Sequence, residues 1–389
     1  MKRTLFCERS LRTPTRSASE GVKPFPRWRF GLVWDVLFMA ASLIIIVGCT
    51  TARAAEPLPP LPPKLSQVEA QHLANIRQVT HGLPRAGEGY FSPDGKSIVY
   101  QAYPIGYPFY QIYVQNIEDG QPRLVSTGRG RTTCSYFSPD GKTILFASSH
   151  TDPQIEETEY KAREKAREEA AKGGRRGYQW DFDPHMDLYT IGLDGRGLKR
   201  ISDAPGYDAE GSYSSDGKQI VFTSSRDGDP DIYVMDADGS HVRQITNTPG
   251  YDGGPFFSPD NKWIIFRSDR QKEHMLQIFA ISVDGKTEVQ LTDNLEHVNW
   301  CPYFHPSGKY FIWAGADYSS GRGTFHLFTM ELSYPDGKLT GGKVTQITDS
   351  DKTDVLPVFS PDGKRLMWTS TRTVENSSQL FIADWSREK

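Results

Sequence analysis

The chain has 389 residues, of which 37% are hydrophobic and 12% aromatic. This composition is sufficient for a sizeable core and excludes disorder over most of the chain. The formal net charge of -3 gives no basic surplus, so nucleic acid is not expected as a partner. The 35 glycines and 26 prolines, together with many aromatic residues, indicate short strands joined by tight turns. The composition therefore favours an all-β fold.

The N-terminus carries the pattern of an export signal. Eight basic residues precede an uncharged run of 13 residues from Val36 to Gly48. This is the order of the charged and apolar regions of a signal peptide. The run is shorter than the roughly 20 residues that a membrane-spanning helix needs. We therefore predict that residues 1–48 are a signal peptide and that the protein is exported to the periplasm.

Two cleavage sites are compatible with this signal. Residues 46–49, Ile-Val-Gly-Cys, resemble the lipobox of bacterial lipoproteins. In that case Cys49 would become the new N-terminus and carry a lipid anchor. The alternative is cleavage after Ala54, because residues 52–54, Ala-Arg-Ala, have the small-x-small pattern of an ordinary signal-peptidase site.

Residues 49–75 are predicted to be a proline-rich linker followed by a short helix. Residues 57–63 contain five prolines and favour the extended polyproline II conformation of a semi-rigid spacer. Ser66 and Glu69 have the spacing of a capping box for a helix that reaches about Asn75. Without residues 1–48 the chain has 37 basic and 45 acidic residues, a net charge of -8.

One hexapeptide, Phe-Ser-Pro-Asp-Gly-Lys in its commonest form, occurs six times. The copies span residues 91–96, 137–142, 213–218, 257–262, 304–309 and 359–364. Proline presets φ at the first corner of a turn, and glycine or asparagine tolerates a positive φ later in it. Each copy is therefore predicted to be a hairpin turn between two strands.

Four strands can be assigned to each repeat. An alternating apolar strand follows every turn, then a third strand, then a fourth that ends in Ser or Thr, as in Ile245-Thr246. Only five such endings follow the first turn, and the sixth, at residues 78–80, precedes it. A ring of sheets has free edges unless its last blade is completed by the first strand of the chain. We predict a six-bladed β-propeller over residues 76–386, with residues 76–80 closing the ring.

The repeat resembles the TolB-type propeller family, whose units carry the same Ser-Pro-Asp-Gly-Lys turn followed by an apolar strand and a Gln-x-Thr ending. The resemblance covers about residues 76–386 and implies the propeller fold. It also implies a part in the Tol–Pal system of the cell envelope. TolB-type proteins carry an additional N-terminal domain, where this chain has a proline-rich segment.

An insertion separates the second and third turns by 76 residues. It lies at about residues 150–185, between the second and third strands of blade two. Its Glu156–Lys172 portion is rich in Glu, Lys, Arg and Ala, and the pairs Glu157/Lys161 and Glu168/Lys172 suit a solvated helix. We interpret it as a surface excursion, with a docking arm for a partner as the alternative.

The residues that line the channel entrance are found by counting back along each inner strand from the turn aromatic. Five residues back stand Ala86, Thr132, Asp208, Asp252, Asn299 and Asp354, and three residues back stand Glu88, Cys134, Glu210, Gly254, Cys301 and Leu356. An acidic mouth could bind a cation or a basic peptide. The alternative is that these acids cap loop amides. The candidate ligand-binding residues are Glu88, Asp208, Glu210, Asp252, Asn299, Trp300 and Asp354.

Cysteine and histidine positions do not predict a bridge or a metal. Cys134 and Cys301 fall in blades two and five and face each other across the channel, too far apart for the Cα spacing of a disulfide. His297 and His305 lie at opposite ends of one inner strand. Alternate residues Asp183, His185 and Asp187 share a face, but such a trio is typical of a hydrogen-bonded strand start. No metal and no cofactor are predicted.

The sequence contains none of the hydrolase, metalloprotease, phosphate-binding or dinucleotide-binding signatures. Our leading hypothesis is a monomeric, non-enzymatic module that binds an envelope protein or peptide. The alternative is a polysaccharide lyase or hydrolase in which Asp208, Glu210 and Glu88 supply acid–base groups. A bare structural scaffold is a third reading.

Overall fold

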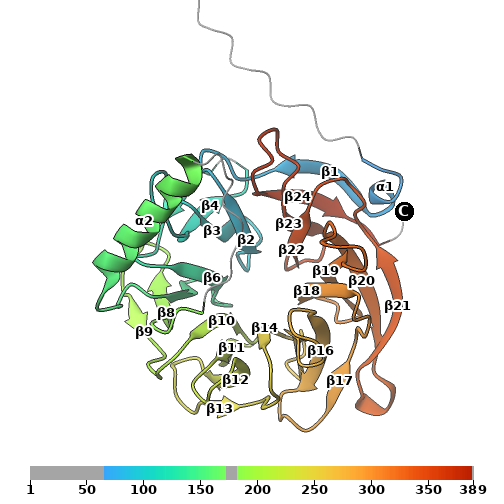
Figure 1. The fold of residues 1–389 in the computed structure, drawn as a ribbon. Coiled ribbons are helices and arrows are strands. Elements are labelled where there is room, and N and C mark those ends of the chain that lie inside the picture. The colour runs from blue at the N-terminus through green and yellow to red at the C-terminus, as the bar shows by residue number, and fades with distance from the viewer. Residues whose placement is uncertain (1–64, 119, 172–181, 388–389) are drawn as a thin grey trace, which may run out of the picture. The chain divides into compact units, whose positions relative to one another are not determined.

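The structure is a computed structural model that describes residues 65–387 apart from 119 and 172–181. The predicted signal peptide, Cys49 and the proline-rich segment lie outside the described residues. The chain divides into units 1–59 and 60–389, and the described residues all belong to the second. In this unit, six four-stranded antiparallel sheets are arranged around a central axis (Figure 1). The predicted six-bladed propeller is confirmed.

Each of the first five blades runs in order from its inner strand to its outer strand. Blade one contains β2 (Ala86–Phe91), β3 (Ser97–Ala102), β4 (Gln111–Asn116) and β5 (Arg123–Leu124); blade two contains β6 (Thr132–Phe137), β7 (Thr143–Ser148), β8 (Asp187–Gly192) and β9 (Lys199–Arg200); blade three contains β10 (Asp208–Tyr213), β11 (Gln219–Ser224), β12 (Asp231–Asp236) and β13 (Arg243–Gln244). Blade four contains β14 (Asp252–Phe257), β15 (Trp263–Ser268), β16 (Gln277–Ser282) and β17 (Glu288–Gln290); blade five contains β18 (His297–Phe304), β19 (Tyr310–Asp317), β20 (His326–Ser333) and β21 (Thr340–Gln346). Blade six contains β22 (Asp354–Phe359), β23 (Arg365–Ser370) and β24 (Gln379–Trp385), and its outer strand is β1 (Leu73–Gln78). A 3₁₀ turn, η1 (Pro335–Gly337), precedes β21.

The repeated hexapeptide forms the turn between the first and second strands of each blade. In the first copy, Ser92 Oγ donates a hydrogen bond to Asp94 Oδ1 at 2.6 Å, and the Lys96 amide donates to the same oxygen at 3.0 Å. Gly95 has a φ of 67°, which glycine adopts without a Cβ clash. The hairpin turns predicted from the hexapeptide are therefore confirmed.

A hydroxyl group follows each outer strand and fastens it to the third strand. In blade four, Thr292 Oγ1 accepts a hydrogen bond from the Ile278 amide at 2.8 Å. In blade six the same role falls to Thr80, which accepts from the Leu380 amide at 2.9 Å. β1 pairs antiparallel with β24, so the N-terminal strand closes the ring as predicted. The strand begins at Leu73, three residues earlier than the predicted boundary.

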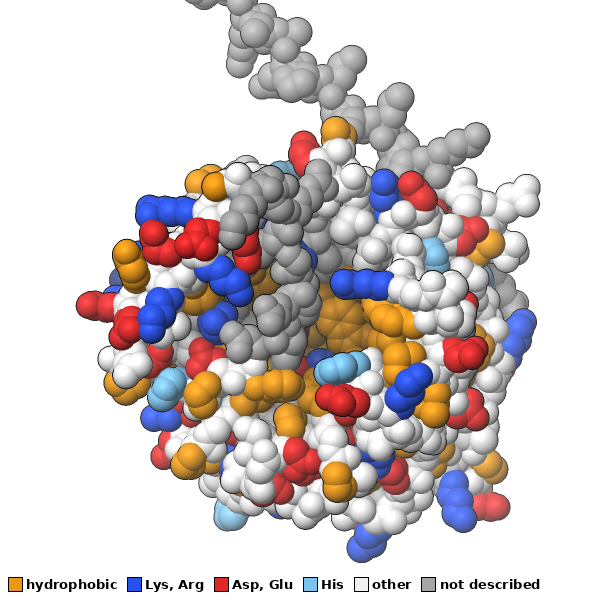
Figure 2. Space-filling model, viewed as in Figure 1, with side chains coloured by type: hydrophobic (Ala, Val, Ile, Leu, Met, Phe, Trp, Pro, Cys, Tyr) orange, Lys and Arg blue, Asp and Glu red, His pale blue; other side chains and the backbone are white. Residues whose placement is uncertain are grey.

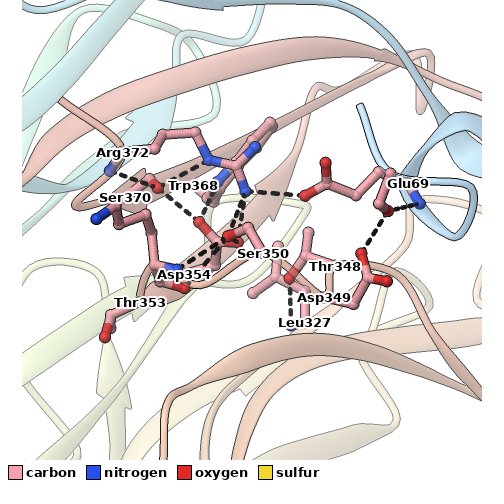
Figure 3. A network of polar contacts seen from close by, with 12 residues as sticks. Glu69, Leu327, Thr348, Asp349, Ser350, Thr353, Asp354, Trp368, Ser370 and Arg372 are labelled. Atoms are coloured by element: carbon pink, nitrogen blue, oxygen red, sulfur yellow. Dashed lines mark hydrogen bonds and ion pairs between the residues drawn. The ribbon is translucent and has the colours of Figure 1, made fainter. Parts of the chain in front are cut away.

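The helix before β1 is shorter than predicted. α1 spans only Glu69–His72, because pairing with β24 already begins at Leu73. The Glu69 amide donates to Ser66 Oγ at 3.0 Å, but the Glu69 carboxylate turns to Arg372 of blade six. Figure 3 shows Arg372 between Glu69 and Asp354. Helix and ion pair thus join the N-terminal segment to the last blade.

The insertion in blade two forms α2 (Ile155–Ala171), between β7 and β8 as predicted. Figure 1 shows it lying along the outside of the first two blades. Lys161 pairs with Glu157 at 2.6 Å, and Lys172 of the other predicted pair lies outside the described residues. One acid is buried: Glu159 accepts hydrogen bonds from Tyr107 Oη at 2.8 Å and Arg129 Nε at 2.9 Å. Glu159, together with Arg163 over the Tyr107 ring at 5.6 Å, therefore attaches a mostly solvated helix to the propeller.

Apolar side chains between neighbouring blades form the core. Trp368, Phe222 and Phe266 are among the largest fully buried side chains, each on the second strand of its blade. Burial of such side chains is the main force that holds the blades together. Neither α1 nor α2 has the length and apolar character needed to cross a bilayer, and this holds for the described part of the chain only.

Candidate binding cavity

A backbone bulge occurs at the same position of all six inner strands, three residues before the turn aromatic. The residue there has a positive φ of 45° to 59°, and the strand register shifts around it. A bulge reorients a side chain relative to the regular pleat. The six bulge residues are Glu88, Cys134, Glu210, Gly254, Cys301 and Leu356, and all six line one central cavity.

The cavity has a volume of about 190 Å³ and lies at the end of the ring where the inner strands begin. Residues of the segments that connect the strands line its outer part: Arg85, Tyr110, Arg322, Phe325, Thr371 and Ser378. Figure 2 shows a hollow near the centre of the ring with hydrophobic side chains around it and charged side chains nearby. The cavity therefore has a polar, partly basic entrance and a more apolar interior.

Aromatic rings close the deeper part of the cavity. Tyr90, Phe256 and Tyr303 each lie two residues beyond a bulge, and their ring centroids are 5.0 to 6.3 Å apart. Tyr136 packs edge-on against Tyr90 and shares a 3.1 Å hydrogen bond with the Tyr303 hydroxyl. Such edge-to-face arrangements are favourable for aromatic pairs. The rings separate the cavity from the turn end of the channel.

Glu210 is held by a dense set of donors. Arg267 Nη2 and Thr223 Oγ1 each lie 2.7 Å from the carboxylate, the Tyr251 hydroxyl lies 3.0 Å from both oxygens, and the Gly254 amide donates at 2.6 Å. Burial and the charge of Glu210 raise the pKa of the Tyr251 hydroxyl. All lone pairs of Glu210 point at fixed partners, so its role is to hold the cavity wall.

Glu88 is also buried, but it has far fewer partners. The Tyr90 hydroxyl lies 3.5 Å from Oε1, and the Cys134 thiol is its other hydrogen-bond partner. Burial raises the pKa of Glu88 from an ordinary 4.5 to about 7, and the negative charge of Glu210 adds to the increase. Among the described residues no Lys, Arg or His side chain lies within ion-pair distance of this carboxylate.

Both cysteines of the ring are free, buried thiols. Burial raises the pKa of Cys134 and of Cys301 well above the usual range, and the charges of the two cavity glutamates act in the same direction. A thiol is nucleophilic only as its thiolate. Neither cysteine is therefore an activated nucleophile at neutral pH.

The structure places four of the seven candidate ligand residues outside the cavity. Asp208 pairs with Arg226 at 3.0 Å, Asp252 with Arg270 at 2.5 Å, and Asp354 with Arg372 at 2.6 Å. These three carboxylates are fully buried at the start of their inner strands. Their role is therefore structural and inside the blades, as in the alternative interpretation from the sequence. Their main partners are arginine side chains, however, and not the loop amides that this alternative named.

Asn299, the fourth of these residues, is buried in blade five. Its side-chain amide donates to Gln277 Oε1 at 3.0 Å, and its oxygen accepts from Trp313 Nε1 at 2.9 Å. Asp354 accepts in the same way from Trp368 Nε1 in blade six, at 3.0 Å. Of the seven candidates, Glu88, Glu210 and Trp300 line the cavity.

The histidine and aspartate groups considered for metal binding do not come together. His185 lies 3.7 Å from Asp152, while Asp187 pairs with Arg200 and Asp183 with Arg131. Across the described residues, no group of three or more His, Cys, Asp and Glu side chains is arranged to hold a metal ion.

Arg267 is a charged cavity residue that the sequence analysis missed, as it missed the aromatic lining of Tyr90, Phe256 and Tyr303. It lies on the second strand of blade four, and its side chain occupies the space above Gly254, where a Cβ would lie 1.8 Å from Nη1. The corresponding segments of the other blades, such as Val221 to Ser224, carry no charge. A single arginine in an otherwise apolar strand, in the blade whose bulge residue is a glycine, was the sequence pattern that could have identified Arg267 as a cavity residue.

The comparisons with known proteins agree with this architecture. The family model of the TolB β-propeller domain matches residues 180–246 and 225–339. Over these residues the ring is similar to the TolB β-propeller domain. The matched residues run from blade two to blade five and include β10, which carries Glu210, and β15, which carries Arg267.

Solved structures are similar to this propeller at low sequence identity. A structure described as TolB from Agrobacterium tumefaciens is 19% identical, with a TM-score of 0.50, and the match covers 81% of this chain and 98% of that one. TolB from Acinetobacter baumannii is also 19% identical, at a TM-score of 0.49, with 78% and 64% covered. An oligogalacturonate lyase from Vibrio parahaemolyticus is 14% identical, at 0.48, with 79% and 93% covered. At 19% identity, the likeness to the Agrobacterium tumefaciens structure concerns the fold alone.

Proposed function

We propose that this protein is an exported, non-enzymatic binding module that takes a segment of an envelope protein or peptide at the open end of the central cavity. The observation that carries the proposal is the cavity itself. It is a concave site with an apolar interior and a few polar groups around its entrance, which is the usual form of a ligand site.

Exposed apolar side chains beside the entrance support a protein partner. Ile105, in the loop between β3 and β4, is 80% exposed, and Val374, in the loop between β23 and β24, is 90% exposed. These loops belong to adjacent blades, and both also contribute residues to the cavity wall, Tyr110 and Thr371 among them. Apolar groups next to a pocket are typical of protein interaction surfaces.

The experiment is a pull-down from solubilised envelopes with the soluble form that starts at Glu56. The test variant is Ile105→Asp/Val374→Asp, which places charge at the rim without disturbing the blades. The matched control is Leu198→Asp/Val242→Asp, because these two half-exposed residues lie in hairpins at the opposite end of the ring. A partner captured by wild type and control but lost by the rim variant is the expected result. Equal capture by all three proteins would contradict the proposal.

One observation favours the alternative of a polymer-cleaving enzyme. The pKa of Glu88 is raised to about 7 by burial, which suits a general base or acid at neutral pH. Against it, the second acid of the cavity, Glu210, is committed to Arg267 and Tyr251. The test is turnover of envelope and plant-type polysaccharides by wild type and by Glu88→Gln. Turnover that depends on Glu88 would establish the enzyme.

A further inference from the structure

We propose that the group entering the central cavity is a protonated primary amine, and that this amine pairs with the carboxylate of Glu88. The inference rests on the binding function proposed above and names the chemistry of the ligand. Two sources share this chemistry, a lysine side chain and the N-terminal amine of a chain.

The first argument is the charge inventory of the cavity. Glu88 is 8% exposed and lines the cavity, and its side-chain partners are the Tyr90 hydroxyl and the Cys134 thiol, both neutral. Arg267, the nearest cation, is held by Glu210 and Tyr251 at 2.7 Å each. Arg85 and Arg322 line the outer part of the cavity, and neither forms an ion pair with Glu88. A buried carboxylate without a cationic partner is unfavourable in its charged form. A cation that enters the cavity supplies the missing partner.

The second argument is the aromatic lining. Tyr90, Phe256 and Tyr303 meet at the deeper part of the cavity, within 6.3 Å of one another. The face of an aromatic ring attracts an ammonium group, and this attraction strengthens when water is excluded. A carboxylate beside aromatic rings is therefore a suitable environment for an alkylammonium group.

Size and donor set favour an amine over a metal ion. The cavity of about 190 Å³ accommodates a short aliphatic chain with a charged end. A divalent cation such as calcium requires six to eight oxygen ligands. Within the described part of the chain, Glu88 is the one cavity carboxylate that is not already saturated by protein donors, and there is no metal-binding group of three.

The pairing makes affinity dependent on pH. The charged and titratable groups that face Glu88 are Tyr90 on its own strand, Cys134 of β6, Glu210 of β10 and Arg267 of β15. With a pKa of about 7, Glu88 is mostly protonated at pH 6 and mostly ionised at pH 8. A lysine side chain stays protonated at both pH values, whereas an α-amine, with an ordinary pKa of about 7.7–8.0, is half or less protonated at pH 8. Affinity should therefore rise about tenfold from pH 6 to pH 8 for a lysine-type amine and about fourfold for an α-amine.

Three matched probes test the inference by isothermal titration calorimetry on the soluble form from Glu56 onward. Nα-acetyl-lysine methylamide has only a side-chain amine, norleucine methylamide has only an α-amine, and Nα-acetyl-norleucine methylamide has neither. The variants are Glu88→Gln and the control Glu375→Gln, which makes the same charge change at an exposed site in the loop between β23 and β24.

We expect at least one amine probe to bind wild type and Glu375→Gln about tenfold or more tightly than the uncharged probe at pH 8. Glu88→Gln should lose both this preference and its pH dependence. Whichever amine probe binds identifies the source. Equal binding of all three probes, a preference that survives in Glu88→Gln, or no binding up to about 20 mM would overturn the inference.

The outcome is separable from that of the proposed function. If the rim variant abolishes capture of a partner while no amine probe distinguishes wild type from Glu88→Gln, the binding function stands and the amine inference fails. If the amine probes bind but no partner is captured at the rim, the cavity chemistry stands and the envelope-protein function fails.

Discussion

The carboxylate of Glu69 lies 3.0 Å from Nη2 of Arg372, although 303 residues separate them in the sequence. Both side chains are almost fully buried, and Arg372 also holds Asp354 at 2.6 Å. In blade four, Arg270 has an equivalent pair of acids, Asp252 and Glu288. Glu69 of the N-terminal segment thus supplies to the last blade the second acid that the outer strand supplies in blade four. Ring closure therefore includes an ion pair as well as strand pairing.

Replacing Glu69 with Gln should weaken this closure. The change leaves the guanidinium of Arg372 with one carboxylate in a buried site, and the expected loss in the free energy of unfolding is about 2–3 kcal/mol. Urea unfolding of the soluble form measures it. Glu118→Gln is the control, because its pair with Arg77 is exposed and should contribute almost nothing. Equal stability of both variants would show that the buried pair does not hold the ring closed.

Gly254 should tolerate no side chain. It has a φ of 59°, and a Cβ there would lie 1.8 Å from Arg267 Nη1. Gly254→Ala therefore combines backbone strain with displacement of a buried cation, and we expect a loss of about 3 kcal/mol or more.

Gly308→Ala separates these two effects. Its φ of 68° is similar, but nothing lies within 4 Å of the added Cβ, so only the backbone strain of about 1 kcal/mol is expected. Comparing the two thermal unfolding transitions provides the measurement. Similar losses in both variants would mean that Arg267 moves aside freely.

The stability of wild type relative to Glu88→Gln should depend on pH. The folded-state pKa of Glu88 is raised to about 7 by burial, above its ordinary 4.5. Between pH 4.5 and 7, the Glu88 carboxyl is ionised in the unfolded chain but still protonated in the folded protein. The folded state of wild type therefore loses stability as the pH rises, and this loss is complete above pH 7. From pH 4.5 to 7.5 the variant should gain about 2–3 kcal/mol relative to wild type in denaturant titrations. A difference that stays constant with pH would indicate an ordinary pKa.

The two ring cysteines should be unreactive in the folded protein. Cys134 and Cys301 are buried and their pKa values are raised. The soluble form from Glu56 onward contains no other cysteine. An Ellman assay at pH 8 should therefore titrate almost no thiol in the folded state and two thiols per chain in urea. Rapid reaction of the folded protein would show that the cavity opens to the reagent.

Sequence alone determined the number of blades, the turns and the way in which the ring closes. These features depend on local patterns in the sequence. Ser92 and Asp94 need only each other to form their turn. Thr80 is the Ser or Thr that follows an outer strand in every repeat, and it stands before the first turn because β1 completes the last blade. The helix before β1 was predicted too long, because a local capping pattern does not register the competing pairing of Leu73 with Trp385.

Tertiary structure alone decided which acids face the cavity. Asp252 and Glu88 both looked like entrance residues, yet Asp252 is paired with Arg270 inside its blade while Glu88 projects from a bulge without a cation. The difference arises from a positive φ and from the position of Arg267, which is 57 residues from its partner Glu210. Repeats specify a backbone through short-range contacts, but the charge balance of a cavity depends on side chains that meet only when the ring has closed.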